Sequence, residues 1–177
     1  EAGSGQTVCD LLGHCGGING VSYSPDGKHI VSASEDNLLK IWEVATGHAV
    51  HNLVGHRNVV YSVSYSPDGK HIASGSHDNI IKIWDSATGL ATHALQGHTS
   101  WVRSVSFSPD GKHIVSGSHD RTVKIWSSTA VHSMHNAQGH NGSVYCLSIS
   151  PDGKHVVSGS RDKTNKIWSI ETGQAVL

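Results

Sequence analysis

A repeat of 42 residues constrains this chain more than any other feature. The six residues Ser-Pro-Asp-Gly-Lys-His occur at 24–29, 66–71, 108–113 and 150–155. Gly-His precedes each copy and Lys-Ile-Trp follows it, always at the same distance. Because the four copies stay in phase without an insertion or deletion, the chain is a tandem array of one unit. A unit of this size cannot bury a core alone, so each unit must stack on its neighbours.

Overall composition argues against several classes of partner. The 177 residues carry a formal net charge of −1, with acids and bases interspersed, whereas a nucleic-acid-binding surface is basic. No apolar run approaches the ~20 residues that a membrane helix needs, so we expect no membrane partner. Cys9, Cys15 and Cys146 form no disulfide framework, which favours a reducing, cytoplasmic location over a secreted one.

Histidine is abundant, but most of the excess comes from the repeat itself. Eight of the 15 histidines belong to the recurring Gly-His and Lys-His positions. Their spacing is not that of zinc ligands, and no Gly-rich loop opens a helix. We therefore expect neither a metal site nor another cofactor.

Each unit contains several strand signals separated by turn chemistry. In the third unit, β-branched residues and period-two alternation predict strands at 102–107, 114–116 and 123–126. Ser-Pro-Asp-Gly is a turn sequence, since Pro presets φ and Gly accepts a positive φ. A fourth strand is expected after Thr46-Gly47, Thr88-Gly89 and Thr172-Gly173, and a different turn in unit three, at Thr129-Ala130. Four short antiparallel strands per unit predict an all-β fold made of β-propeller blades.

The order of these motifs resembles the WD-repeat (WD40) family. Gly-His, Ser-Pro-Asp-Gly, Ser-x-Ser-x-Asp and Lys-Ile-Trp follow one another in every unit, over residues 6–177. The Trp-Asp dipeptide itself is present only at Trp84-Asp85. The near-identity of the copies is also similar to the WD-repeat arrays of fungal and bacterial NACHT-type signalling proteins. The resemblance implies four blades per chain, each of four antiparallel strands.

The repeat also predicts the limits of each part of the chain. We expect a flexible lead at 1–5, a closing outer strand at 6–12, and blades at 13–54, 55–96, 97–138 and 139–177. The strand at 6–12 would complete the sheet of a last blade.

Three ways of closing a ring are open. Two chains could form one eight-bladed ring with two-fold symmetry, which makes self-association the favoured expectation. The chain could also be a piece of a longer array, or four blades could close alone.

The resemblance further implies a hydrogen-bonded set in each blade, made of His, Ser, Asp and Trp. The matching positions are His14, Ser32, Asp36 and Trp42; His56, Ser74, Asp78 and Trp84; His98, Ser116, Asp120 and Trp126; and His140, Ser158, Asp162 and Trp168. His-Ser-Asp also resembles a hydrolase triad. Four copies without a distinct cleft favour a structural role, so we expect no enzyme and no catalytic residue.

Function is expected where the copies differ, which is just after Gly-His and just before the turn Asp. In WD-repeat propellers these positions reach the top face around the central channel. They predict a partner-binding surface containing Glu35, Tyr61, His77, Trp101, Arg103, His119, Tyr145 and Arg161. Trp, Tyr and Arg are the residue types most enriched at binding hot spots, although Trp101 could instead pack under a neighbouring blade.

Two functions fit this surface. The first is a non-catalytic scaffold that binds a protein or peptide on the top face. The alternative is a carbohydrate-binding, lectin-like propeller that binds glycans at repeated sites, because aromatic rings can stack on sugars.

One departure from the repeat concerns an inward strand position. Asn165 occupies the place of Leu39, Ile81 and Val123. A buried amide without partners is costly, so blade four either supplies a polar partner or meets something other than a standard blade there.

Overall fold

The computed structural model describes residues 9–129 and 132–176, and this part of the chain consists of strands and turns. It contains no helix long and apolar enough to cross a membrane. The strands are β1 (Ile18–Tyr23), β2 (His29–Ser34), β3 (Leu39–Glu43), β4 (Ala49–Leu53), β5 (Val60–Tyr65), β6 (His71–Ser76), β7 (Ile81–Asp85), β8 (Ala91–Leu95), β9 (Val102–Phe107), β10 (His113–Ser118), β11 (Val123–Ser127), β12 (Ser133–Ala137), β13 (Val144–Ile149), β14 (His155–Ser160) and β15 (Asn165–Ser169).

The strands form four antiparallel sheets in chain order, which we call blades 1 to 4. Blades 1, 2 and 3 each have four strands, β1–β4, β5–β8 and β9–β12. Blade 4 has three, β13–β15, and beyond them the chain makes one isolated bridge, between Trp168 and Ala175. The predicted all-β fold with four blades is confirmed, with the fourth strand of blade 4 reduced to that bridge.

The Ser-Pro-Asp-Gly turn joins the first two strands of each blade. In blade 3 the Ser108 hydroxyl donates to Asp110 Oδ1 over 2.6 Å and accepts from the His113 N–H over 2.9 Å. Gly111 has φ of 72°, which favours glycine because a Cβ would be strained there. This internal bonding explains why the same turn sequence recurs in every blade.

Each blade packs its two faces against its neighbours. We call the face toward the preceding blade the backward face and the face toward the next blade the forward face. Ala73 and Ile81 on the forward face of blade 2 are buried in one cluster with Val102, Val105 and Phe107 on the backward face of blade 3. The junctions between blades 1 and 2 and between blades 3 and 4 repeat this arrangement. The core therefore lies between blades, as the stacking argument predicts.

The innermost strands β1, β5, β9 and β13 lie next to one another in sequence order. Serine hydroxyls connect them, since Ser22 Oγ accepts from the Tyr65 N–H over 3.2 Å and Ser62 Oγ accepts from the Val105 N–H over 3.1 Å.

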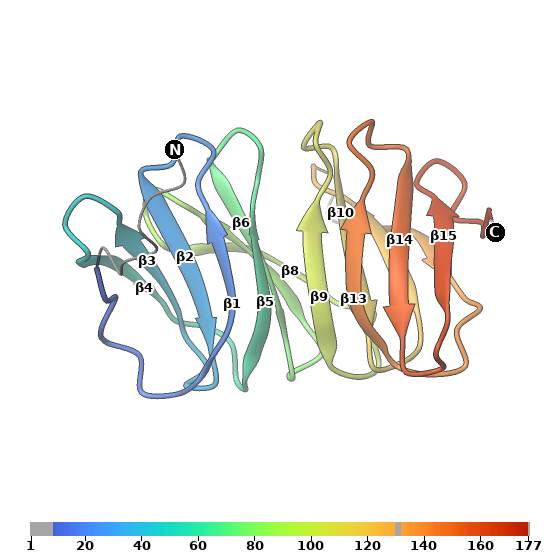
Figure 1. Cartoon of the computed structure of the whole chain (residues 1–177), viewed down its shortest axis with the longest axis horizontal. Coiled ribbons are helices and arrows are strands. Elements are labelled where there is room, and N and C mark those ends of the chain that lie inside the picture. Colours follow the sequence, from blue (N-terminus) through green and yellow to red (C-terminus); the bar gives the residue numbers. More distant parts are fainter. Residues whose placement is uncertain (1–8, 130–131, 177) are drawn as a thin grey trace, which may run out of the picture.

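The four blades form an open fan rather than a closed ring. Figure 1 shows β3 and β4 of blade 1 toward one end of the molecule and β15 of blade 4 toward the other. On the backward face of blade 1, Val21 and Tyr23 are 66% and 63% exposed. Their counterparts in blade 2, Val63 and Tyr65, are only 7% and 8% exposed. Blade 1 thus presents an uncovered copy of a surface that is buried at each internal junction.

The chain before blade 1 differs from the predicted closing strand at 6–12. Residues 9–12 form no strand, and residues 6–8 lie outside the described residues. Cys9 and Leu11 lie beside Gly47 in the turn before β4, so this segment runs along blade 1 and not along blade 4. The predicted flexible lead at 1–5 and the Thr129-Ala130 turn fall wholly or partly outside the described residues.

Asn165 is explained by the same open geometry. It lies on the forward face of blade 4, which no following blade covers, and it is exposed. Leu39, Ile81 and Val123 at the same position are completely buried at the three internal junctions. An exposed amide needs no protein partner, which removes the cost of burying it.

This comparison predicts that the same residue type has opposite effects at two equivalent positions. Ile81→Asn places an unpartnered amide at the junction of blades 2 and 3 and should lower the free energy of unfolding by about 3–5 kcal/mol. Asn165→Ile on the exposed face should change it by less than ~0.5 kcal/mol. Urea denaturation of both variants tests this, and equal losses would contradict the assigned packing.

Candidate interaction face and buried hydrogen-bond sets

The structure brings together the predicted His, Ser, Asp and Trp of every blade. In blade 3, His98 Nδ1 lies 2.7 Å from Asp120 Oδ2, and His98 Nε2 lies 2.7 Å from Ser116 Oγ. The indole N–H of Trp126 donates to the same Ser116 Oγ over 2.8 Å. The sets in the other three blades have the same bonds at 2.7–2.9 Å.

The direction of the protons follows from the donors available. Indole only donates and an ionised carboxylate only accepts. Trp126 therefore donates to Ser116, Ser116 donates to His98 Nε2, and His98 donates from Nδ1 to Asp120. Each group of the set thus donates or accepts in a role that its chemistry allows.

The burial of the serines in these sets argues against the interpretation of the sets as hydrolase triads. Ser74, Ser116 and Ser158 are fully buried, and each hydroxyl is bonded to both a Trp and a His. A substrate cannot reach such a hydroxyl. The arrangement suits a structural connection between strands and not a nucleophile.

Glycine before the histidine also has a physical reason. Gly97 has φ of 151°, and a Cβ built on it would lie 3.2 Å from the Trp126 ring. A side chain here would press on the buried indole, so the Gly-His pair and the Trp belong to one packed unit.

The aspartates of the sets also accept backbone bonds that fix two loops. Asp120 Oδ2 accepts from the Thr99 N–H over 3.0 Å, and Asp120 Oδ1 accepts from the Thr122 N–H over 3.0 Å. One carboxylate thereby joins the loop before the first strand of the blade to the turn between its second and third strands.

These bonds keep the carboxylates ionised at low pH. Burial raises the pKa of Asp78, but hydrogen bonds from His56 and from backbone N–H groups outweigh burial and lower the pKa to about 2. The balance is the same at Asp120, where burial opposes the bond from His98 and the pKa is lowered. In blade 4 the bond from the Thr164 hydroxyl is the largest cause that lowers the pKa of Asp162.

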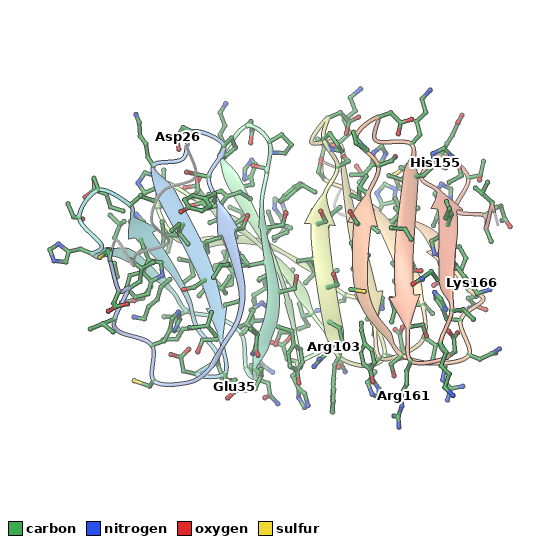
Figure 2. All side chains as sticks on the ribbon, viewed as in Figure 1. Asp26, Glu35, Arg103, His155, Arg161 and Lys166 are labelled. Atoms are coloured by element: carbon green, nitrogen blue, oxygen red, sulfur yellow. The ribbon has the colours of Figure 1, made fainter. Side chains whose placement is uncertain are left out.

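The predicted interaction residues lie at one end of the sheets. Figure 2 shows Glu35, Arg103 and Arg161 along the lower edge of the molecule, while Asp26 lies at the opposite edge. We call the first the top face, following the propeller convention, and the second the turn face, because it carries the Ser-Pro-Asp-Gly turns. Backbone bonds hold the top-face loops in pairs, as between the His119 N–H and the Trp101 carbonyl at 2.8 Å.

Four of the predicted residues form an aromatic stack across blades 2 and 3. The Trp101 indole lies between the His77 ring at 4.0 Å and the His119 ring at 4.8 Å, measured between ring centroids. The Tyr61 ring lies 6.4 Å from Trp101. Trp101 is partly exposed, so its ring is not buried under a neighbouring blade.

Arg103 extends this cluster to blade 4. Its guanidinium carbon lies 4.1 Å from the centroid of Tyr61 and 5.7 Å from that of Tyr145. A guanidinium at these distances from aromatic faces makes cation–π contacts that hold the rings in place. The stack and Arg103 together form what we call the aromatic cluster: Tyr61, His77, Trp101, Arg103, His119 and Tyr145.

Two predicted residues lie outside the aromatic cluster. Glu35 lies against Gly17 in blade 1. Arg161 lines a cavity of about 410 Å³ between blades 3 and 4, which it shares with His119, Arg121 and Asn141. Sequence reasoning missed Arg121 and Asn141. Arg121 could have been found, because its position varies as Asn37, Asn79, Arg121 and Lys163 among the copies.

Metal binding finds no support in the described part of the chain, which has no group of three His, Cys, Asp or Glu side chains that could hold an ion. The histidines of the four Gly-His pairs are bonded to Ser and Asp within the buried sets.

The carboxylate geometry predicts a fall in stability between about pH 4 and pH 2. The folded pKa of Asp78 is about 2, below its unfolded value near 4, so the stabilisation is complete above about pH 4 and is lost as the pH falls through the folded value. Urea denaturation from pH 5 to pH 2 should show a smaller fall for Asp78→Asn than for the parent chain. Asp10→Asn, an exposed aspartate outside the sets, is the control. An equal fall in the parent and Asp78→Asn would count against a stabilising role for this carboxylate.

Comparison with known proteins identifies the fold family. A family model described as IFT122 first beta-propeller matches residues 17–127, more than half of the chain. A second model, described as WD domain, G-beta repeat, matches residues 131–169.

Curated relatives match over single units. WD repeat-containing protein 1 of Bos taurus is 50% identical over 44 residues, which cover 23% of this chain and 7% of that protein. Lissencephaly-1 homolog 1 of Paramecium tetraurelia is 40% identical over 40 residues, covering 23% and 10%. Ribosome assembly protein 4 of Saccharomyces cerevisiae is 45% identical over 40 residues, covering 23% and 8%. The match thus spans a tenth or less of each relative, and the likeness to NACHT-type arrays stays a prediction.

The blades, the buried His-Ser-Asp-Trp sets and the two family models lead to one conclusion. The chain belongs to the WD40-repeat β-propeller family.

Proposed function

We propose that this chain is a non-catalytic interaction module that binds a protein or peptide partner on its top face. WD-repeat proteins generally act as protein-interaction scaffolds. The observation that carries the proposal is the aromatic cluster, in which a partly exposed Trp101 is held between two histidines. Rigid Trp, Tyr and Arg side chains that need little ordering on binding are the usual anchors of protein interfaces.

The asymmetry of this face favours a protein over a glycan there. The positions equivalent to Trp101 in the other blades are Gly17, Val59 and Ser143. Only one blade therefore supplies the central ring, so the face offers one site and not a repeated one. A single asymmetric site suits a folded domain or a peptide with its own asymmetric sequence.

Other observations support the remaining parts of the proposal. A non-catalytic role is supported by the buried, fully bonded serines of the sets. The net charge of −1 supports a protein partner over nucleic acid. Cys9, Cys15 and Cys146 are free and exposed, which suits a reducing, cytoplasmic location.

Removing the central ring tests the top-face proposal. Peptides selected by display against the parent chain should bind Trp101→Ala at least ~10-fold more weakly, because a hot-spot truncation costs more than about 1 kcal/mol and often 2 or more. Lys70→Ala on the turn face is the control and should bind like the parent. Selected peptides that bind Trp101→Ala with unchanged affinity would contradict the proposal.

Self-association is a second part of the proposed function. The open fan leaves a backward face on blade 1 and a forward face on blade 4, the two halves of a junction that occurs three times inside the chain. Val157 on the forward face of blade 4 is 42% exposed. Gly159 there corresponds to Gly117, which accommodates Val144 of the next blade. We propose that a second copy covers both faces and forms a ring of two chains.

Solution mass tests this arrangement directly. Light scattering on a size-exclusion column should give twice the chain mass of 18.8 kDa. Val21→Glu should shift the mass to that of one chain, since a charge would be buried on the backward face of blade 1. Lys28→Glu, an exposed position on the turn face of the same blade, is the control. A parent chain that runs as a monomer at all concentrations would overturn the two-chain ring.

A further inference from the structure

The turn face contains a pocket that occurs twice, away from the top face. One cavity of about 380 Å³ opens between blades 1 and 2, and another of about 630 Å³ opens between blades 2 and 3. Their linings correspond position by position at the repeat spacing, so that His29, His51 and Tyr65 of the first become His71, His93 and Phe107 of the second.

The first pocket combines an aromatic ring with an unused donor. Tyr65 is 8% exposed and lines the cavity, and its hydroxyl has no hydrogen-bond partner among the described residues. Burial, together with the nearby Asp26 carboxylate, raises the pKa of Tyr65 to about 12. The hydroxyl therefore stays protonated at neutral pH. The hydroxyl is reachable from the cavity, so it can bond to a ligand that enters there.

Carboxylates and imidazoles provide the remaining polar groups of the first pocket. Asp26 Oδ1 accepts from the Ser24 hydroxyl over 2.6 Å and from the Lys28 N–H over 3.0 Å. The bond from Ser24 is the largest cause that lowers the pKa of Asp26, so this group is ionised at neutral pH. In the described chain Asp26 Oδ2 has no donor, which leaves it free to accept from a ligand hydroxyl. His29 and His51 line the same cavity.

The third junction lacks the aromatic ring and the serine that the first two pockets share. Between blades 3 and 4, Ile170 stands in the place of Ser86 and Ser128, and Ile149 stands in the place of Tyr65 and Phe107. Ile170 is buried there, and the cavity at this junction is lined by Met134 and Ile170 together with polar residues that include Lys154 and Glu171, but by no aromatic side chain other than histidine. The junction of blades 3 and 4 therefore serves as an internal negative control for ligand binding at the first two junctions.

We propose that the pockets between blades 1 and 2 and between blades 2 and 3 each bind one sugar ring. An apolar edge of the sugar would pack on the small exposed part of Tyr65 or Phe107, and the sugar hydroxyls would bond to the carboxylates and imidazoles. A pocket that pairs an aromatic wall with a few converging polar groups is the usual form of a small-ligand site. Repetition on adjacent blades suits a polymer of repeating sugar units, whose binding gains from two linked sites.

The local charge favours a neutral ligand over a cation. Neither cavity is lined by Lys or Arg among the described residues, but Lys28 and Lys70 lie beside the carboxylates of Asp26 and Asp68. Each carboxylate charge is thus partly offset by a neighbouring lysine. A second cation would gain little, whereas neutral hydroxyl donors would still bond to the free carboxylate oxygens.

Amide NMR of the full chain, titrated with a panel of methyl hexosides and methyl N-acetylhexosaminides, tests the proposal. We expect at least one glycoside to shift signals at both pockets at ~1–10 mM, the range of a single weak sugar site. Signals at the junction of blades 3 and 4 should stay in place. Lysine amide and arginine amide are titrated in parallel.

Three variants sharpen this test. Ser86→Ile copies Ile170 of blade 4, so the fold already accommodates it, and it should abolish the shifts at the first pocket while leaving those at the second. Tyr65→Phe removes only the hydroxyl and should weaken the first pocket by ~3–10-fold. Trp101→Ala on the top face should leave the titration unchanged, which separates this site from the proposed protein-binding face.

Three outcomes would overturn the sugar site. The first is that no glycoside shifts the signals of either pocket up to ~50 mM, well above ordinary weak affinities. The second is that Ser86→Ile leaves the glycoside shifts unchanged. The third is that lysine or arginine amide shifts these signals while no glycoside does. The last would identify the pockets as sites for basic side chains.

Discussion

The hydrogen-bonded chain from Trp through Ser and His to Asp is the interaction on which the rest of the structure depends. In blade 3 it connects the third strand through Trp126, the second strand through Ser116, the loop before the first strand through His98 and the turn through Asp120. Because the groups are buried or nearly so and each is used in its proper role, removing one leaves another polar group without its partner. The same three bonds recur in every blade, so the family's most recognisable residues are structural here.

The open fan follows from how such blades are stabilised. A blade has two apolar faces and buries each one only against another blade. Three junctions bury six faces, and blade 1 and blade 4 each keep one face without a partner. The two remaining faces are not equally apolar. Blade 1 exposes Val21 and Tyr23, whereas blade 4 exposes Asn165 where its counterparts are aliphatic. Asn165 is thus the polar residue among four equivalent positions, and it lies on the face that no following blade covers.

The two ends of the sheets show different relations to the repeat. At the top face the copies diverge, and the divergence concentrates one aromatic cluster on blades 2 to 4. At the turn face the copies agree, and agreement produces the same pocket at two junctions. Asymmetry suits a single protein partner, and repetition suits a ligand that is itself repetitive. One array can therefore carry both kinds of surface without either disturbing the buried sets between them.

Sequence alone determined the blade and its internal chemistry. The period gave the number of units, the Ser-Pro-Asp-Gly turn and strand alternation gave the order of strands, and the family resemblance identified the members of each buried set. The units, turns and strand order are local consequences of composition and spacing, which repeat because the unit repeats, whereas the buried sets were implied by the resemblance. Tertiary structure decided what depends on neighbours: that the fan stays open, that residues 9–12 lie by Gly47 instead of forming a closing strand, and that Asn165 is solvent-exposed. It also decided that Trp101 stacks with His77 and His119, and that Tyr65 presents a free hydroxyl to a pocket between blades. Contacts between blades join residues of different units, such as His77 and Trp101, and no periodicity within one unit encodes the distance between such side chains.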